Sequence, residues 1–364
     1  MKASEIINYL SATVPLTLQE DYDNSGLQVG DESMDISSVL LSVDVTEDIV
    51  DEAIKDGSGL IITHHPLIFK GLRRISGRTL TERVISRAIK NDIAIYSAHT
   101  NLDVIPGGVS YRMAHKIGLK DISPLTEING KLLKVAVFVP EKNVDDVRMA
   151  MFNAGAGSLG AYDHCSFNTV GEGSFRAGEG TKPHKGEIGS DHFEKEIKTE
   201  VILPDYKKSA VVSAMIKSHP YEEVAYDVLR LENALPGAGL GCIGNLDKAV
   251  EAEKFLENIA EIFDARGVKY SGSVDGTVKK VAVCGGSGSS LIKDALARGA
   301  DIFITADIKY HSFFEGNNRM IIADIGHYES EKYSLEILYE LITKKFPKFA
   351  VRFSKNNTNP INYL

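Results

Sequence analysis

The sequence predicts an α/β protein, with an outer α/β/α domain of two similar halves that is interrupted by an inserted ferredoxin-like α+β domain. Short apolar runs alternate with helix-like stretches near both ends of the chain, which is typical of buried parallel strands joined by crossover helices. The middle third has another order of elements. The length of 364 residues also exceeds what one hydrophobic core usually serves.

The first half of the outer domain contains three predicted strands separated by helices. The strands are expected at residues 38–45, 60–63 and 93–99. The helices are expected near residues 3–11, 47–55 and 79–91. Each strand is a short apolar run flanked by glycine or polar residues, which predicts a parallel sheet that is buried on both faces.

The last third of the chain repeats this alternation. Strands are predicted at residues 279–286, 301–307 and 320–326, with a helix at about 289–298. Aligned by eye, LIITHHP resembles DIFITADIKYH, and IAIYSAHTNLD resembles MIIADIGHYESE. This similarity indicates a weak internal duplication with related chemistry at the strand ends.

Between the two halves lies a stretch with the order strand, helix, strand, strand, helix, strand. It consists of LLKVAVFVP (132–140), a helix at 143–154, a glycine-rich run at 155–189, KTEVILP, a helix at 205–218 and a strand near VAYDVLRL. This order is that of a ferredoxin-like sandwich. A proline and glycine cluster at 235–244 marks its exit. We therefore predict an inserted domain at 130–236 within a discontinuous outer domain of 1–129 and 237–364.

Composition narrows the function classes. A formal net charge of -9 argues against nucleic acid as a partner. The three cysteines are widely spaced, which fits neither a disulfide framework nor a thiolate zinc finger and favours a reducing compartment. The N-terminus lacks an uninterrupted apolar core, and no stretch approaches about 20 apolar residues. We therefore predict a cytoplasmic protein that does not span a membrane.

Polar side chains follow three of the predicted strands, where sites of open α/β sheets gather. The candidate metal ligands at these strand ends are His64, His65, Asp103, His327 and Glu331. His327 and Glu331 are four residues apart, so both project from one face of a helix that begins after Gly326. The adjacent His64 and His65 point in different directions, which suits two neighbouring ions better than one.

Three imidazoles and two carboxylates form a mixed nitrogen and oxygen ligand set. Such a set accepts zinc, iron, manganese, cobalt or nickel, and no soft thiolate selects among them. We predict two divalent ions per chain, with zinc as the first expectation. A single histidine of this kind is more often a hydrogen-bonded structural residue, but five ligand-type residues at three strand ends favour a metal site.

Weaker candidates lie beside these ligands. His99 and Asp307 are candidate proton-transfer residues, and Asp307 with His311 could instead orient the ligands. Gly285, Gly286, Ser287 and Gly288 connect a strand to a helix and form a candidate anion site, with a plain tight connection as the alternative. HPYEE at 219–223 joins a histidine to two carboxylates, but a structural role for His-Pro in a turn is the stronger interpretation.

At these residues the chain resembles a known family. HHPLIFKG, SAHTNLD and GHYESE are similar to the motifs of the NIF-three-like proteins, dinuclear metal-centre proteins often named GTP cyclohydrolase type I-like. The similarity extends from DNSGLQVG (23–30) to GHYESE, and the middle resembles the PII-like or CutA-like insertion of the longer bacterial members. One departure is Tyr22, which stands where the family often has tryptophan.

The resemblance implies a toroidal homohexamer, a trimer of dimers, with the metal sites facing an inner cavity. It implies that His65 and Asp103 hold one metal, that His64 and His327 hold the other, and that Glu331 bridges both. His99 is similar to an inner-cavity residue of the family. These features predict a metal-dependent hydrolase for a small nucleotide-like or phosphate-containing substrate. The alternative is a non-catalytic hexamer that binds a metal or a metabolite and carries a regulatory insert.

Overall fold

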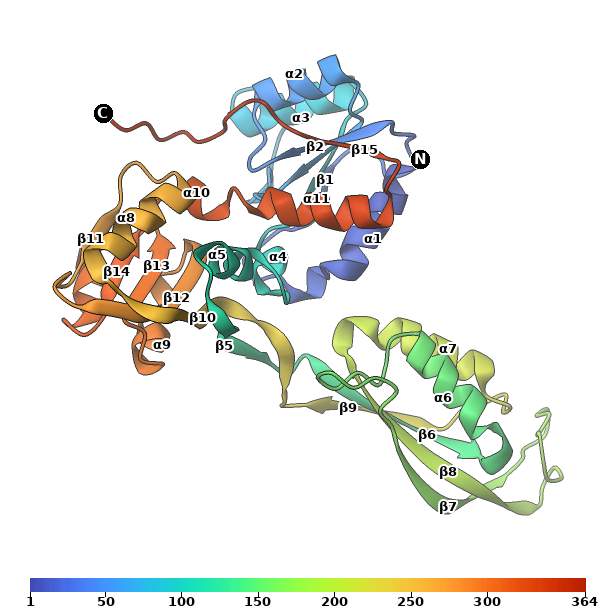
Figure 1. The fold of residues 1–364 in the computed structure, drawn as a ribbon. Coiled ribbons are helices and arrows are strands. Elements are labelled where there is room, and N and C mark those ends of the chain that lie inside the picture. The colour runs from blue at the N-terminus through green and yellow to red at the C-terminus, as the bar shows by residue number, and fades with distance from the viewer. The chain divides into compact units, whose positions relative to one another are not determined.

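In the computed structural model, which describes residues 1–364, the chain divides into two compact units (Figure 1). The first, called unit 1, comprises Met1–Thr126 and Gly237–Leu364. The second, called unit 2, comprises Glu127–Pro236. Unit 1 contains two sheets, and unit 2 contains one. No helix is both long and apolar enough to cross a membrane.

The first sheet of unit 1 has five strands in the order β1 (Gly26–Val29), β4 (Ala94–Ser97), β3 (Leu60–Thr63), β2 (Ser38–Ser42) and β15 (Ala350–Phe353). All neighbours are parallel except β1, which runs antiparallel to β4. The helices of this half are α1 (Ala3–Thr13), α2 (Glu47–Asp56), α3 (Leu80–Lys90) and α11 (Ser334–Lys345). Helices α2 and α3 cover one face, and α1 and α11 lie on the other (Figure 1).

Amphipathic helices explain this layering. The N-terminus of helix α3 is capped by Thr79, because its side chain accepts a hydrogen bond from the Glu82 N–H. Its buried residues, with those of α2, form one core with the inward side chains of the sheet. Every residue of the short strands β2, β3 and β4 is buried, as expected for the central strands of a parallel sheet.

The second sheet of unit 1 has six strands in the order β11 (Lys269–Ser271), β14 (Ile321–Asp324), β13 (Ile302–Ala306), β12 (Thr277–Ser287), β10 (Ala234–Glu251) and β5 (Lys120–Asn129). The three central strands β12, β13 and β14 are parallel. The accompanying helices are α4 (Thr100–Val104), α5 (Val109–Ile117), α8 (Ala252–Phe263), α9 (Ile292–Ala297) and α10 (His327–Glu331). Separate buried clusters lie on the two faces of this sheet.

Unit 2 has a four-stranded antiparallel sheet in the order β7, β8, β6, β9. Its elements in chain order are β6 (Leu132–Pro140), α6 (Val144–Asn153), β7 (Phe167–Arg176), β8 (Asp191–Pro204), α7 (Lys208–Ser218) and β9 (Tyr226–Leu231). Both helices lie on the same face of the sheet (Figure 1). The core lies between that face and the helices. This order of elements is the one predicted from the sequence and is that of a ferredoxin-like sandwich.

The α/β class predicted from the sequence is confirmed. Five further elements are short 3-10 helices, at Leu16–Leu18, Glu141–Asn143, Asp205–Lys207, Ser289–Leu291 and Tyr310–Gly316. The predicted helix at 289–298 is thus split into a 3-10 turn and α9. The C-terminal strand β15, which the sequence analysis missed, pairs with β2 of the first half.

Candidate metal centre

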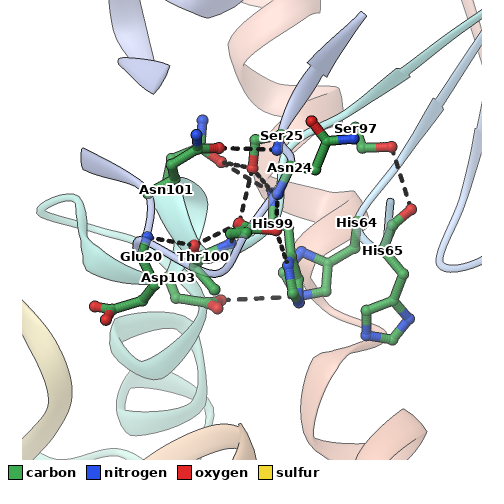
Figure 2. Close-up of polar contacts among 12 residues, drawn as sticks. Glu20, Asn24, Ser25, His64, His65, Ser97, His99, Thr100, Asn101 and Asp103 are labelled. Carbon is green, nitrogen blue, oxygen red and sulfur yellow. Dashed lines mark hydrogen bonds and ion pairs between the residues drawn. The ribbon is translucent and has the colours of Figure 1, made fainter. Parts of the chain in front are cut away.

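Three segments of unit 1 meet where strands of its two sheets end. His64 and His65 follow β3 directly, and Asp103 lies in α4 just after β4. His327 and Glu331 form the first and last residues of α10, which follows β14 of the other sheet. Figure 2 shows His64, His65 and Asp103, with Asp103 directed toward His64. The five predicted ligands therefore lie together.

Glu331 lies at the centre of the cluster. Its Oε2 is 2.8 Å from the Nε2 of His65 and 2.9 Å from the Nε2 of His327, and these two nitrogens are 3.1 Å apart. Its Oε1 is 3.7 Å from the Nε2 of His64. Glu331 is only 3% exposed, so its carboxylate is held among imidazoles and away from water.

A second group of atoms contains His64 and Asp103. The Nε2 of His64 lies 3.7 Å from Asp103 Oδ1, and both atoms are buried without any hydrogen-bond partner. Ligand atoms about 2.1 Å from a tetrahedral ion are roughly 3.4 Å from one another. Buried polar atoms are rarely left unsatisfied, so two orphans at this separation fit a cation that both would contact.

The grouping differs from the division that the resemblance implies. The Nε2 of His65 lies 3.1 Å from that of His327, and the Nε2 of His64 lies 3.7 Å from Asp103 Oδ1, and each of these pairs is close to one oxygen of Glu331. The sets that could hold an ion by ligand-atom spacing are His65, His327 and Glu331, and also His64, His65 and His99. The residues present therefore fit a metal ion.

Each imidazole is anchored through its Nδ1 atom, so that Nε2 is directed into the site. The Nδ1 of His64 donates to the Ala98 carbonyl at 2.9 Å. The Nδ1 of His65 lies 2.7 Å from Asp44 Oδ1, and the Nδ1 of His327 lies 2.7 Å from Asp307 Oδ2. Metal-ligating histidines usually have such a partner, which fixes the tautomer and the ring orientation.

The electrostatics of the cluster call for positive charge. Burial opposes the charged ring, but Asp44 and Glu331 together raise the pKa of His65 to about 10. Burial likewise opposes the charge of His327, yet Glu331 and Asp307 raise its pKa to about 9. Burial raises the pKa of Asp103 to about 6 although His64 opposes the shift. A bound cation would supply the charge that protons otherwise bring.

His99 extends the site through a polar network with the segment that precedes β1. Its Nδ1 lies 2.8 Å from Asp23 Oδ1, and Thr100 donates to Asp23 Oδ2 from both its N–H and its hydroxyl. Figure 2 labels His99 and Thr100 of this network, together with Ser25 and Asn101, which share a hydrogen bond. Burial favours the neutral acid, but the hydrogen bonds from His99 and Thr100 hold the pKa of Asp23 well below its usual range.

A cavity of about 460 Å³ opens beside the cluster. Its lining includes four of the cluster's side chains, namely His65, Asp103, His327 and Glu331. It also includes His99, Tyr22 and Phe69, and, from the turn, Cys284, Gly285, Ser287 and Gly288. The ligand groups are thus accessible to a small molecule, and aromatic rings lie beside them.

The candidate anion site at Gly285, Gly286, Ser287 and Gly288 is not supported. The N–H groups of the three glycines donate to the hydroxyls of Ser110, Ser330 and Thr305 in turn, so they are not free for a phosphate. The turn has another role. A Cβ atom at Gly286 would lie 2.1 Å from Glu331 Oε1, so glycine leaves room for that carboxylate.

Two supporting residues were missed by the sequence analysis. Asp44 orients His65, and Asp23 orients His99. Asp44 follows the strand at 38–42 and could have been found by the same strand-end rule that selected His64 and His65. Asp23 begins the DNSGLQVG motif that the sequence analysis noted, but it lies far from His99 in the sequence, and nothing in the motif indicates this pairing. Asp307 was predicted in two roles, and its contact with His327 favours the orienting one.

Comparisons with known proteins agree over the whole chain. The family model described as Duf34/NIF3 (NGG1p interacting factor 3) matches residues 1–360. A protein of Halalkalibacterium halodurans named GTP cyclohydrolase 1 type 2 homolog is 42% identical over 368 residues, which cover 99% of this chain and 98% of that protein. A Bacillus subtilis protein of the same name is 38% identical, with 100% and 99% covered. The solved structure of a Bacillus cereus protein related to NIF3 has a TM-score of 0.89 at 37% identity, with 100% and 99% covered.

Proposed function

The chain belongs to the Duf34/NIF3 family, and from this membership and the geometry of the site we propose that it is a dinuclear metal-dependent hydrolase. The position of Glu331 carries the proposal, since its two oxygens face two different groups of ligand atoms. His65 and His327 would hold one ion, His64 and Asp103 would hold the other, and Glu331 would bridge them.

Zinc is the ion we expect first, because imidazole and carboxylate ligands suit it, and iron, manganese, cobalt and nickel are the alternatives. Two such ions, when bound, lower the pKa of a shared water and so supply a nucleophile near neutral pH. The protein contributes the fixed ligand positions. Asp44 and Asp307 hold the rings of His65 and His327 so that their Nε2 atoms stay directed inward.

We assign proton transfer to His99. Its Nδ1 is bonded to Asp23, so Nε2 is the nitrogen left for a substrate or a water. The ring centre of His99 lies 5.3 Å from that of His64 and 5.5 Å from that of His65, so a small substrate at the ligand cluster would be within reach of His99. Asp23 remains charged at neutral pH and therefore stabilises the imidazolium that forms when His99 takes a proton.

The cavity and the relatives' names support a nucleotide-like substrate. A volume of about 460 Å³ is in the range of small-molecule sites. Tyr22 and Phe69 offer rings against which a base could stack, with ring centres 6.3 Å apart. Because relatives are named GTP cyclohydrolase 1 type 2 homolog, GTP is the first substrate to test.

We further propose that the chain assembles into a homohexamer, a trimer of dimers whose metal centres face an inner cavity. Light scattering at micromolar concentration should then give six times the chain mass of 39.7 kDa. A monomer would contradict the assembly but would leave the metal centre untouched.

The central experiment combines metal content with turnover. Elemental analysis of the untagged protein should give two metals per chain, and Glu331→Gln should lose both. A hydrolysis screen with GTP and other nucleotides should show turnover only in the metal-loaded protein. His99→Gln should keep the metal and lose turnover by about 100-fold or more, as expected for general acid–base catalysis. The exposed His115→Gln serves as the matched control.

A second candidate is a non-catalytic hexamer that binds metal or a metabolite and reports it through unit 2. The observation that favours it is a separate cavity of about 620 Å³ within unit 2. Two metals per chain without turnover of any nucleotide would favour this candidate. Absence of metal from the wild-type protein would refute both.

A further inference from the structure

The sheet of unit 2 has one covered and one open face, and the open face is hollowed. Alternate residues of β6, including Val135 and Val137, pack in the core beneath the helices, so Ala136 and Phe138 face the other way. On that side lies a cavity of about 620 Å³. Its lining comes from β6, β7 and β8, from residues 177–184, and from the turn before β9. The volume is in the range of small-molecule sites.

Two glycines of β7 create the hollow. In the β7–β8 register Gly171 is opposite Glu196, and Gly173 is opposite Glu194. Residues opposite each other point to the same face, so the glycines leave space where side chains would otherwise stand beside Glu196. A Cβ atom on Gly173 would lie 2.2 Å from Glu196 Oε2, which means that the carboxylate lies across this glycine.

Glu196 is a buried carboxylate without a cation. It is only 9% exposed, and its single side-chain hydrogen bond comes from the Tyr221 hydroxyl to Oε1 at 2.9 Å. Oε2 accepts no hydrogen bond from the protein, and Glu196 forms no ion pair. Buried charges are normally paired, because removing an ion from water is costly. An unpaired carboxylate on a cavity wall therefore indicates a cationic ligand.

The other charges around the cavity strengthen this imbalance. Glu172, Glu222 and Glu223 also line it and form no ion pairs. The two cationic residues of the lining are already engaged. Arg176 donates from two nitrogens to Asp191 at 2.8 Å each, and the Lys198 Nζ lies 3.4 Å from Glu200. The unpaired charge of the cavity is therefore negative.

The HPYEE segment of the sequence builds one wall of this cavity. His219 donates from Nε2 to the Phe138 carbonyl and accepts at Nδ1 from the Tyr221 N–H, so its ring is neutral and cannot compensate Glu196. Both ring nitrogens are in use, which leaves none for a metal. The histidine instead fixes the turn that presents Tyr221, whose ring centre lies 6.2 Å from that of Phe175.

We propose that the cavity of unit 2 binds a small organic cation, an ammonium, amidinium or guanidinium group on a planar or apolar body, with the cation at Glu196 and the body against Phe138, Phe175 and Tyr221. Aromatic faces attract cations and also bury apolar surface, so the rings serve both parts of such a ligand. The site lies entirely in unit 2, and its occupation does not depend on the metal centre.

The test uses three probe cations and two matched uncharged or anionic compounds on the full chain. Benzamidine, phenethylamine and agmatine would be titrated by calorimetry at low salt, beside neutral benzamide and anionic benzoate. At least one cation should bind with one site per chain and at least tenfold more tightly than benzamide. If no cation exceeds benzamide, or if benzoate binds best, the proposal is wrong.

Variants then locate the site. Glu196→Gln keeps the shape of the side chain and should lower the affinity for the bound cation at least tenfold. Gly171→Leu should fill the hollow and abolish binding, since the nearest atom to a Cβ there is 4.0 Å away and the backbone is not strained. Glu141→Gln, an exposed position of unit 2 outside the cavity lining, is the control. Equal affinities in Glu196→Gln and Glu141→Gln, or undiminished binding in Gly171→Leu, would overturn the assignment.

Discussion

Replacing Gly286 with alanine should strongly weaken metal binding without altering any of the five proposed ligands. Gly286 is buried near the end of β12 and has φ +60, a conformation that costs other residues about 1–2 kcal/mol. The added Cβ would lie 2.1 Å from Glu331 Oε1, whereas ordinary contact begins at 3.4 Å. The carboxylate must therefore move by the difference, 1.3 Å.

A displacement of this size is large on the scale of metal coordination. Ligand distances in a working site hold to within about 0.2 Å, so Glu331 can no longer serve both groups of ligands. We expect zinc affinity to fall by at least the 10–100-fold that loss of an orienting partner typically costs. Elemental analysis after dialysis and a competition titration with a zinc chelator would measure the effect.

Gly299→Ala is the matched control for the backbone cost. Gly299 has φ +71 and no atom within 4 Å of an added Cβ, and it is exposed. Both variants should therefore lose about 1–2 kcal/mol of the free energy of unfolding through strain alone. Only Gly286→Ala should also lose metal. If the two variants bind zinc equally well, the reasoning about Glu331 is refuted.

Three other predictions concern the surroundings of the site and the fold. Asp307→Asn should weaken zinc binding 10–100-fold, measured by competition titration, because His327 loses its anchoring carboxylate. Stripping the metal with a chelator should lower Tm, since an ion at about 100 times its Kd stabilises the native state by about 2.7 kcal/mol; an unchanged Tm would contradict this. Finally, hydrogen bonds from the Arg78 and Ser76 backbone and from the Ser76 hydroxyl lower the pKa of Glu82 from 4.5 to about 2. These hydrogen bonds hold the loop at residues 76–78, so its amide protons should be fully protected from exchange above about pH 4.5 and lose that protection as the pH falls toward 2. Hydrogen exchange would measure this change, and Glu82→Gln should abolish its pH dependence.

The central strands of the fold could be predicted because their signal is local. The runs at 60–63 and 301–307 are mostly apolar, and the structure has strands at Leu60–Thr63 and Ile302–Ala306. Edge strands carry no such signal. The strand β15 is mostly exposed and belongs to its sheet only through pairing with β2, which lies some three hundred residues earlier. Pairing over that distance leaves no periodic trace in either segment.

The ligand-type residues of the site could likewise be found, but their arrangement could not. A histidine after a buried strand is visible in the sequence, as at His64 and His65. Which nitrogen faces which carboxylate depends on side-chain contacts, and these grouped His65 with His327. The glycine turn was compatible in the sequence with an anion site or with a plain tight connection, because the distant hydroxyls that accept from its N–H groups, such as that of Ser330, leave no mark in the local sequence.

The position of α10 explains why the two halves of unit 1 form a single site. His64, His65 and Asp103 come from one sheet, and a half with these residues alone lacks the carboxylate that lies between the two ligand groups. Glu331 comes from the other sheet, and the chain then returns, since α11 and β15 pack on the first sheet. The segment from α10 to β15 thus carries the proposed shared ligand on a connection fixed at both ends. An ion held there would join the two sheets, so metal loss should loosen their contact before it unfolds either one.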